Sequence, residues 1–167
     1  NPLIYTIENF IDNETCNHFI NLSKNKLKPS LVTYDDKGIE SKGRTSINCW
    51  ISHKHDDLVF SVANKISQLL NIPLENAESY QIIYYDINGK YRNHYDGWLF
   101  DNSDKSNRCL KNGGQRLITA LCYLNEVIEG GETKFTKLNI KIDPSPGKLL
   151  VFKNVYNQTN IRNHLSE

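Results

Sequence analysis

Two stretches of this sequence place a histidine two residues before an aspartate, a spacing at which an imidazole and a carboxylate can bind one metal ion. The first is "HDD" at residues 55–57, and the second is "HYD" at residues 94–96. A match this short also arises by chance, so the structural setting of each copy has to decide between them.

The first copy lies where a helix is predicted to begin. In "DLVFSVANKISQLL", residues 57–70, apolar side chains recur at spacings of three and four, which predicts an amphipathic helix. Residues i and i+2 of a helix do not face one another, whereas acidic groups at a helix start are favoured by the unpaired N–H groups and the dipole. We therefore interpret Asp56 and Asp57 as capping and surface residues.

The second copy lies on a predicted strand, residues 90–96. Side chains at i and i+2 of a strand project from the same face, so His94 and Asp96 can both reach one ion. A third ligand is still needed. His164 follows the last predicted strand by a short polar loop that could return it to this face, whereas the other histidines lie in or beside predicted helices. We expect His164 to complete the site.

The turn signal "NG" at residues 88–89 extends this prediction to a neighbouring tyrosine. A two-residue hairpin loop there would pair Tyr85 with Arg92. Tyr85, His94 and Asp96 would then share one face of the hairpin.

Two histidines and one carboxylate on one side of a metal form the facial triad of non-haem Fe(II) oxygenases. Zinc can use the same ligands in a hydrolytic site, so the ligand types leave the metal open.

The elements that must position these residues fall into two parts. Up to residue 72 we expect a short strand, a helix with Asp12 as its N-cap, and the helix at residues 57–70. From Pro73 onward the sequence is rich in short strand-like segments, with a polar loop at residues 101–114. Strands are predicted at 79–87, 90–96, 115–125, 133–142 and 147–153. Their spacing is too short for helical crossovers, which indicates an antiparallel sandwich or jelly roll.

Composition favours one soluble domain of 167 residues. Lys and Arg (20) nearly balance Asp and Glu (19), so nucleic acid is an unlikely partner by charge. The apolar runs are far too short for a membrane span. No signal segment opens the sequence, which favours the cytoplasm over a secretory compartment. The four cysteines lack a C-x-x-C spacing, which argues against a zinc knuckle or redox dithiol, and no oligomeric state is predicted.

Several motifs, in order along nearly the whole chain, resemble the prolyl 4-hydroxylase branch of the Fe(II)/2-oxoglutarate dioxygenases. "IENFIDNETCNHFINLSKNKLKPS" resembles the family's opening, "GRTS" its short basic motif, and "YYDINGKYRNHYD" its approach to the iron. "GGQRLITALCYLNEVIEGGETKF" is the most specific match. "PSPGKLLVFKN" followed by "NHLSE" is similar to the end of the core with its distal histidine.

This resemblance implies one domain over residues 1–167, mostly β with supporting α-helices. Helical support would occupy residues 1–72 and a double-stranded β-helix (jelly roll) core residues 73–167. Iron would be held by His94, Asp96 and His164.

The same resemblance assigns further contacts and the reaction. Tyr85 and Thr133 match positions that bind 2-oxoglutarate, and Tyr91 and Arg116 match positions near the peptide. The implied activity is 4-hydroxylation of prolyl residues in a peptide or protein, with 2-oxoglutarate and dioxygen as cosubstrates and L-ascorbate as reductant. The 2-oxoglutarate would be decarboxylated to succinate and CO2.

One departure concerns the cosubstrate's far carboxylate. The family places a lysine a short distance after the distal histidine, beyond Glu167 of this sequence. We expect a further C-terminal strand to carry it. The alternatives are that Lys148 or Arg116 serves as the cation, or that 2-oxoglutarate binding is impaired.

Two other functions stay open. The same core could hydroxylate another side chain, a free amino acid or, least in keeping with the neutral charge, a nucleic-acid methyl group. A non-catalytic peptide-binding jelly roll is the alternative from a different class.

Overall fold

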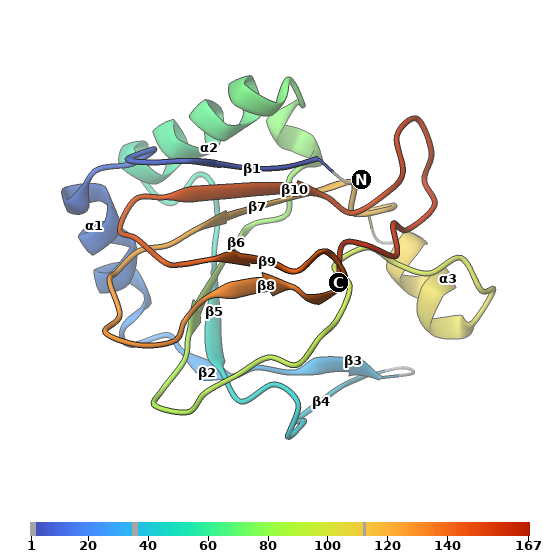
Figure 1. Ribbon diagram of the computed structural model, residues 1–167. Coiled ribbons are helices and arrows are strands. Elements are labelled where there is room, and N and C mark those ends of the chain that lie inside the picture. The colour runs from blue at the N-terminus through green and yellow to red at the C-terminus, as the bar shows by residue number, and fades with distance from the viewer. Residues whose placement is uncertain (1–2, 35–36, 112) are drawn as a thin grey trace.

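The centre of the molecule is a three-stranded antiparallel sheet, here called sheet A. The structure is a computed structural model that describes residues 3–34, 37–111 and 113–167. Sheet A has the order β1 (Ile4–Ile7), β10 (Leu149–Lys153) and β7 (Ile118–Cys122). Both β1 and β7 pair with β10 (Figure 1), so the first and last strands of the chain lie side by side.

The middle strand, β10, is buried on both faces because its sequence "LLVFK" is apolar at every position but the last. Alternate residues of a strand face opposite sides. Leu149 and Val151 join one core cluster with residues of α1 and α2, and Leu150 and Phe152 join a second cluster with Phe135. Figure 1 accordingly shows α2 above sheet A and the β8–β9 hairpin below it.

A second three-stranded antiparallel sheet, sheet B, has the order β2 (Lys28–Pro29), β5 (Ile47–Ile51) and β6 (Tyr80–Tyr84). Two hairpins complete the β structure among the described residues. They are β3 (Val32–Tyr34) with β4 (Lys37–Ile39), and β8 (Thr133–Phe135) with β9 (Ile140–Ile142). Because β1 and β5 belong to these sheets, the first 72 residues supply strands as well as helical support.

Two helices confirm the predicted caps. α1 (Asn13–Ser23) begins after Asp12, whose carboxylate accepts from the Thr15 N–H at 2.8 Å. α2 (Asp57–Leu70) begins after Asp56, which accepts from the Val59 N–H at 2.9 Å. The second oxygen of Asp56 lies 2.8 Å from His18 Nε2, so this cap also ties α2 to α1.

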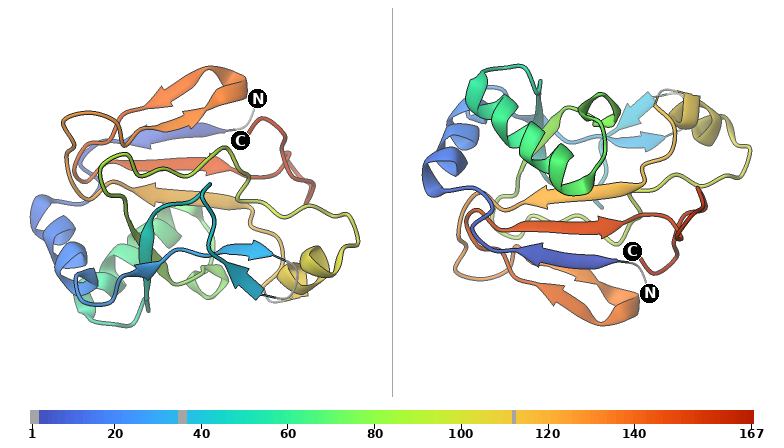
Figure 2. Two further views of the ribbon diagram at one scale, coloured as in Figure 1. Left: turned by 90° about the horizontal axis from the view of Figure 1, so that it is seen from below. Right: turned by 90° about the horizontal axis from the view of Figure 1, so that it is seen from above.

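The polar segment at residues 101–114 was predicted as a loop, but it contains α3 (Asp104–Lys111). Local polar contacts explain this helix. Asp101 accepts from the Ser103 hydroxyl at 2.6 Å, and Ser103 Oγ accepts from the Ser106 N–H. An acidic first turn and a basic last turn complement the helix dipole. The helix lies at the opposite end of the molecule from α1 (Figure 2).

The strand predicted at residues 90–96 is absent, and so is the pairing of Tyr85 with Arg92. A type I′ hairpin turn needs positive φ at both central residues, and here Asn88 has φ 62° whereas Gly89 has no positive φ. The chain after this turn instead joins residues 43–45. The Arg92 N–H donates to the Gly43 carbonyl at 2.8 Å, and the Thr45 N–H donates to the Lys90 carbonyl at 2.9 Å.

Residues 133–142 were predicted as one strand, but they form the β8–β9 hairpin. The single-turn 3-10 helix η2 (Thr136–Leu138) connects the two strands, and Asn139 takes a left-handed φ of 53° at its end. A second such turn, η1 (Leu74–Asn76), precedes β6. The expectation of a mostly β protein with supporting helices is confirmed.

Among the residues that the structure describes, no helix combines the length and the apolar character needed to cross a membrane.

Candidate active site

His94 and Asp96 meet even though they lie in an irregular segment. His94 Nε2 is 3.3 Å from Asp96 Oδ1, and His94 Nδ1 is 2.9 Å from the Arg92 carbonyl oxygen. A carbonyl only accepts hydrogen bonds, so Nδ1 carries a hydrogen in this contact. Nε2 and the carboxylate oxygen of Asp96 face each other, and both are atom types that bind metal ions.

The Asp96 carboxylate is held by a residue of sheet A. The Thr119 hydroxyl, on β7, donates to Asp96 Oδ2 at 2.6 Å. Burial opposes ionisation of Asp96, but its contacts with His94 and Thr119 outweigh burial and hold its pKa below the ordinary 3.8. The group is therefore an anion at neutral pH, as a metal ligand must be.

Tyr91 lies directly against the proposed ligand His94. The two rings are stacked with centroids 3.6 Å apart, and the Arg44 guanidinium lies 4.7 Å from the Tyr91 centroid. Burial raises the pKa of the Tyr91 phenol, so its hydroxyl stays protonated at neutral pH.

His164 is returned toward the end of sheet A by a short hairpin. Val155 and Arg162 form an isolated bridge, and the Asn163 N–H donates to the Asn154 carbonyl at 2.8 Å. The Tyr95 hydroxyl donates to the His164 carbonyl at 3.3 Å, which links this hairpin to the segment carrying His94. The imidazole Nδ1 of His164 contacts the Tyr156 hydroxyl.

The predicted ligands have suitable donor atoms for a metal ion, but they are not all grouped around one point. Both His94 and His164 use Nδ1 for another partner, which leaves Nε2 for a metal, as is usual for ligating histidines. Within the described part of the chain, however, no three His, Cys, Asp or Glu side chains are grouped so as to hold a metal ion. The structure thus brings His94 and Asp96 together and does not bring His164 to them as a third ligand.

Thr133, expected at the 2-oxoglutarate site, forms a hydroxyl pair with Tyr123. The Tyr123 hydroxyl donates to Thr133 Oγ1 at 2.7 Å. Tyr123 directly follows β7, and Thr133 is the first residue of β8. Burial raises the pKa of Tyr123, so the phenol is a neutral donor.

Tyr85, the other expected 2-oxoglutarate contact, follows the end of β6. Burial also raises the pKa of the Tyr85 phenol, against the effects of Arg44 and of a hydrogen bond with Ser46. The negative charge of Asp96 raises this pKa further, so Tyr85 shares the electrostatic environment of the proposed metal ligands.

Arg116, expected near the peptide, is engaged in an ion pair. Its guanidinium donates to both oxygens of Glu78, with Nη2 at 2.8 Å from Oε2, and it lies 4.4 Å from the Trp98 ring centroid. Lys148, the other cation considered for 2-oxoglutarate, bonds the Asp143 carbonyl at 2.8 Å and lies 3.3 Å from Glu8.

The sequence reasoning missed Thr119, Tyr123 and Asn154. Thr119 and Tyr123 lie within the apolar run "LITALCYL", and Asn154 follows the run "LLVFK". A hydroxyl or amide within or directly after such a run was the available signal, because a buried polar group has to find a hydrogen-bond partner.

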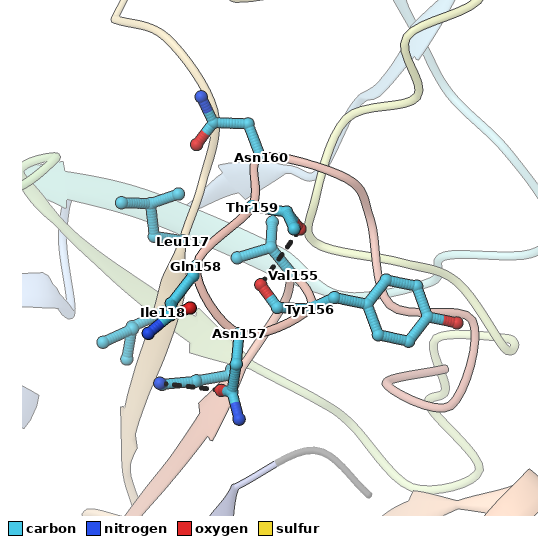
Figure 3. Close-up of a pocket in the computed structure, with 9 residues that line it drawn as sticks. Leu117, Ile118, Val155, Tyr156, Asn157, Gln158, Thr159 and Asn160 are labelled. Atoms are coloured by element: carbon cyan, nitrogen blue, oxygen red, sulfur yellow. Dashed lines mark hydrogen bonds between the residues drawn. The ribbon is translucent and has the colours of Figure 1, made fainter.

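A pocket of about 420 Å³ lies beside the hairpin that carries His164. Leu117, Ile118 and the loop at residues 155–160 line it. Figure 3 shows the Tyr156 phenol extending away from Leu117 and Ile118, so the ring that contacts His164 does not close this pocket.

Comparison with known families shows which family this sequence matches. The model of the "2OG-Fe(II) oxygenase superfamily" matches residues 80–164, which include β6, β7 and all three predicted metal ligands. The chain belongs to this superfamily.

Individual proteins similar to this chain are named as prolyl 4-hydroxylases. The chain is 40% identical to "Probable prolyl 4-hydroxylase 7" of Arabidopsis thaliana over 136 residues, which cover 80% of this chain and 41% of that protein. It is 37% identical to Arabidopsis prolyl 4-hydroxylase 5 over 147 residues, which cover 87% and 48%. The chain spans about half the length of these curated relatives.

The fold is similar to that of a solved viral enzyme. The crystal structure of the viral collagen prolyl hydroxylase of Paramecium Bursaria Chlorella virus-1, in complex with 2OG, superimposes with a TM-score of 0.73. The match covers 98% of this chain and 84% of the viral chain at 24% identity.

Proposed function

We propose that this chain is the catalytic domain of an Fe(II)- and 2-oxoglutarate-dependent prolyl 4-hydroxylase that acts on a proline-containing peptide or protein. The observation that carries the proposal is the contact of His94 Nε2 with Asp96 Oδ1 inside the segment that matches the superfamily. The identity of 37–40% to plant prolyl 4-hydroxylases supports the prolyl substrate.

The proposal includes the architecture of the domain. We expect residues 1–167 to act as one domain whose strands belong to a double-stranded β-helix. The likeness to the viral prolyl hydroxylase fold supports this expectation.

His94, Asp96 and His164 would hold the iron. The ionised Asp96 and two imidazoles whose Nδ1 atoms bond other groups would supply the donor set. When bound, iron with 2-oxoglutarate and dioxygen would supply the oxidation of a prolyl C–H bond, with release of succinate and CO2 and with L-ascorbate as reductant.

The residues around the site would bind and orient the organic molecules. Tyr85 and Thr133, the latter together with Tyr123, would offer hydroxyls to 2-oxoglutarate. The phenols of Tyr85 and Tyr123 have raised pKa values and so remain protonated; Tyr123 donates to Thr133, whose own hydroxyl hydrogen would then be available to 2-oxoglutarate.

Tyr91 and Arg116 would contact the peptide. The Tyr91 ring is already next to His94, so a proline placed against it would lie beside the metal ligands. Arg116 would bond peptide carbonyls through the guanidinium hydrogens that its pair with Glu78 leaves available.

The test is to incubate the full-length protein with Fe(II), 2-oxoglutarate, ascorbate and a proline-rich peptide. We expect the peptide to gain the mass of one oxygen atom and succinate to be released in step. Succinate release without oxidation of any proline peptide would indicate a hydroxylase of another substrate. Tight peptide binding with no succinate would instead support a non-catalytic binding module.

A further inference from the structure

The side chain of Asn154 connects the core of sheet A to the proposed ligand Asp96. Asn154 follows β10 and is completely buried. Its amide Nδ2 donates to Thr119 Oγ1 at 2.9 Å, and Thr119 in turn donates to Asp96 Oδ2 at 2.6 Å. A relay of two hydrogen bonds therefore fixes one oxygen of the carboxylate, while the other oxygen faces His94.

The backbone of Asn154 fixes the segment that carries His164. Its N–H donates to the Leu117 carbonyl at 2.9 Å, and its carbonyl accepts from the Asn163 N–H at 2.8 Å. Asn163 is the residue before His164. Asn154 is thus bonded directly to the segment that carries His164, and through Thr119 to Asp96.

The residue after Asp96 packs closely on the same asparagine. A Cβ added at Gly97 would lie 3.2 Å from the Asn154 carbonyl oxygen and 3.3 Å from its Cβ, closer than side chains ordinarily pack. A side chain at position 97 would push the ligand segment away from β10. Glycine therefore lets the backbone next to Asp96 approach Asn154.

Packing alone does not account for an asparagine here. In the described structure, Asn154 Oδ1 is buried without a hydrogen-bond partner. An unsatisfied buried acceptor costs stability, whereas an apolar side chain of the same shape would avoid that cost. What the amide provides and an apolar residue cannot is the hydrogen bond to Thr119.

We propose that Asn154 and Thr119 are positioning residues that orient the Asp96 carboxylate, and with it the site, for metal binding. The inference rests on the proposed function, because it takes Asp96 to be a metal ligand. Its physical basis is that a carboxylate with one oxygen held by a fixed donor keeps the other oxygen in place, and loss of such support typically weakens metal binding 10- to 100-fold.

The test measures Mn²⁺ dissociation constants of the protein in the absence of peptide. Thr119→Val keeps the shape of the side chain but removes the hydroxyl, and we expect its Mn²⁺ dissociation constant to rise about 10- to 100-fold. Thr119→Ser keeps the hydroxyl and should bind like the wild type. Thr6→Val makes the same change at an exposed site on β1 of the same sheet, and it should have no effect.

Asn154→Leu interrupts the relay at its other end and should also raise the Mn²⁺ dissociation constant. If Thr119→Val no longer unfolds cooperatively, the Mn²⁺ affinity of Asn154→Leu tests the inference instead. The double variant Thr119→Val with Asn154→Leu should bind Mn²⁺ no more weakly than the weaker single variant, because both changes interrupt one relay. The thermal midpoint of each metal-free variant shows how much of any change comes from stability.

The outcomes separate this inference from the proposed function. If wild type binds Mn²⁺, His94→Ala does not, and Thr119→Val binds as tightly as Thr119→Ser, the relay has no positioning role. If the full-length wild-type protein binds no metal, the proposed function itself fails. Equal weakening in Thr6→Val would also overturn the inference.

Discussion

The ring of Tyr91 stacks on the imidazole of His94, with centroids 3.6 Å apart and planes inclined by 19°. A residue expected to contact the peptide is therefore in contact with a residue expected to bind the metal. The stack restricts the rotation of the imidazole, whose other restraint is the bond from Nδ1 to the Arg92 carbonyl. A change to the Tyr91 ring should therefore affect metal binding as well as peptide binding. A change to its hydroxyl alone should leave metal binding intact.

Replacing Tyr91 separates these two roles. Tyr91→Phe keeps the stack and should leave the metal dissociation constant unchanged, whereas Tyr91→Ala removes it. A stacked aromatic pair contributes about 0.5–1.5 kcal/mol, so Tyr91→Ala should raise the Mn²⁺ dissociation constant about 2- to 12-fold. Titration calorimetry of both variants checks this. Equal metal affinity in both variants would show that the stack does not orient His94.

The hydroxyl pair of Tyr123 and Thr133 should set the affinity for 2-oxoglutarate. Removal of either hydroxyl, in Tyr123→Phe or Thr133→Val, should raise the KM for 2-oxoglutarate about 2- to 12-fold, the value of one hydrogen bond. Tyr85→Phe should act in the same direction. Tyr5→Phe on β1 is the matched control. A changed peptide KM with an unchanged 2-oxoglutarate KM would remove these residues from the cosubstrate site.

Arg116 and Glu78 form an ion pair, and replacing each member should affect the peptide KM differently. The pair is exposed, so breaking it from either side should cost at most about 1 kcal/mol of stability. If Arg116 also bonds the peptide, Arg116→Gln should raise the peptide KM about tenfold or more, whereas Glu78→Gln should raise it little. Steady-state kinetics with a proline-rich peptide measures both. Matching KM values in the two variants would leave Arg116 only an ion-pair role.

The cap of α2 gives a prediction about stability and pH. Asp56→Ala removes the acceptor for the Val59 N–H and should lower the free energy of unfolding by about 1 kcal/mol at pH 7. Asp56→Asn keeps an acceptor and should cost less.

The pH dependence of this cap follows from its pKa. The bond from Val59 holds the pKa of Asp56 below its ordinary 3.8, so the charged group stabilises the fold above that value. This contribution is lost as the pH falls through the lower, folded-state pKa. The difference between wild type and Asp56→Asn in urea unfolding should therefore shrink below pH 3.8. A difference that stays constant down to lower pH would contradict the pKa shift.

The helices and the core strands could be predicted because each depends on a local pattern. The helix at residues 57–70 has both a cap and a regular apolar face, and β10 is a short apolar run. α3 (DKSNRCLK) has few apolar residues, and its buried residue is the polar Ser106. It is stabilised by capping serines and by end charges, which composition does not reveal.

The site could be predicted only in part, because its contacts depend on tertiary structure. His94 and Asp96 were expected to meet on a strand, and they meet in an irregular segment that bonds residues 43–45. That partner lies far away in the sequence. The hydrogen bond from Asn154 to Thr119, which supports Asp96, joins the end of β10 to β7. The pairing of two distant strands cannot be read from the periodicity of either segment.

The most direct test of the proposed function uses heavy-isotope dioxygen. The full-length protein is incubated with Fe(II), 2-oxoglutarate, ascorbate and a proline-rich peptide under this gas, and the peptide is fragmented in a mass spectrometer. We predict that a prolyl residue carries one heavy oxygen atom, and that His94→Ala and Asp96→Ala yield none. Unmodified proline in the wild-type reaction, with no succinate formed, would contradict the proposed function.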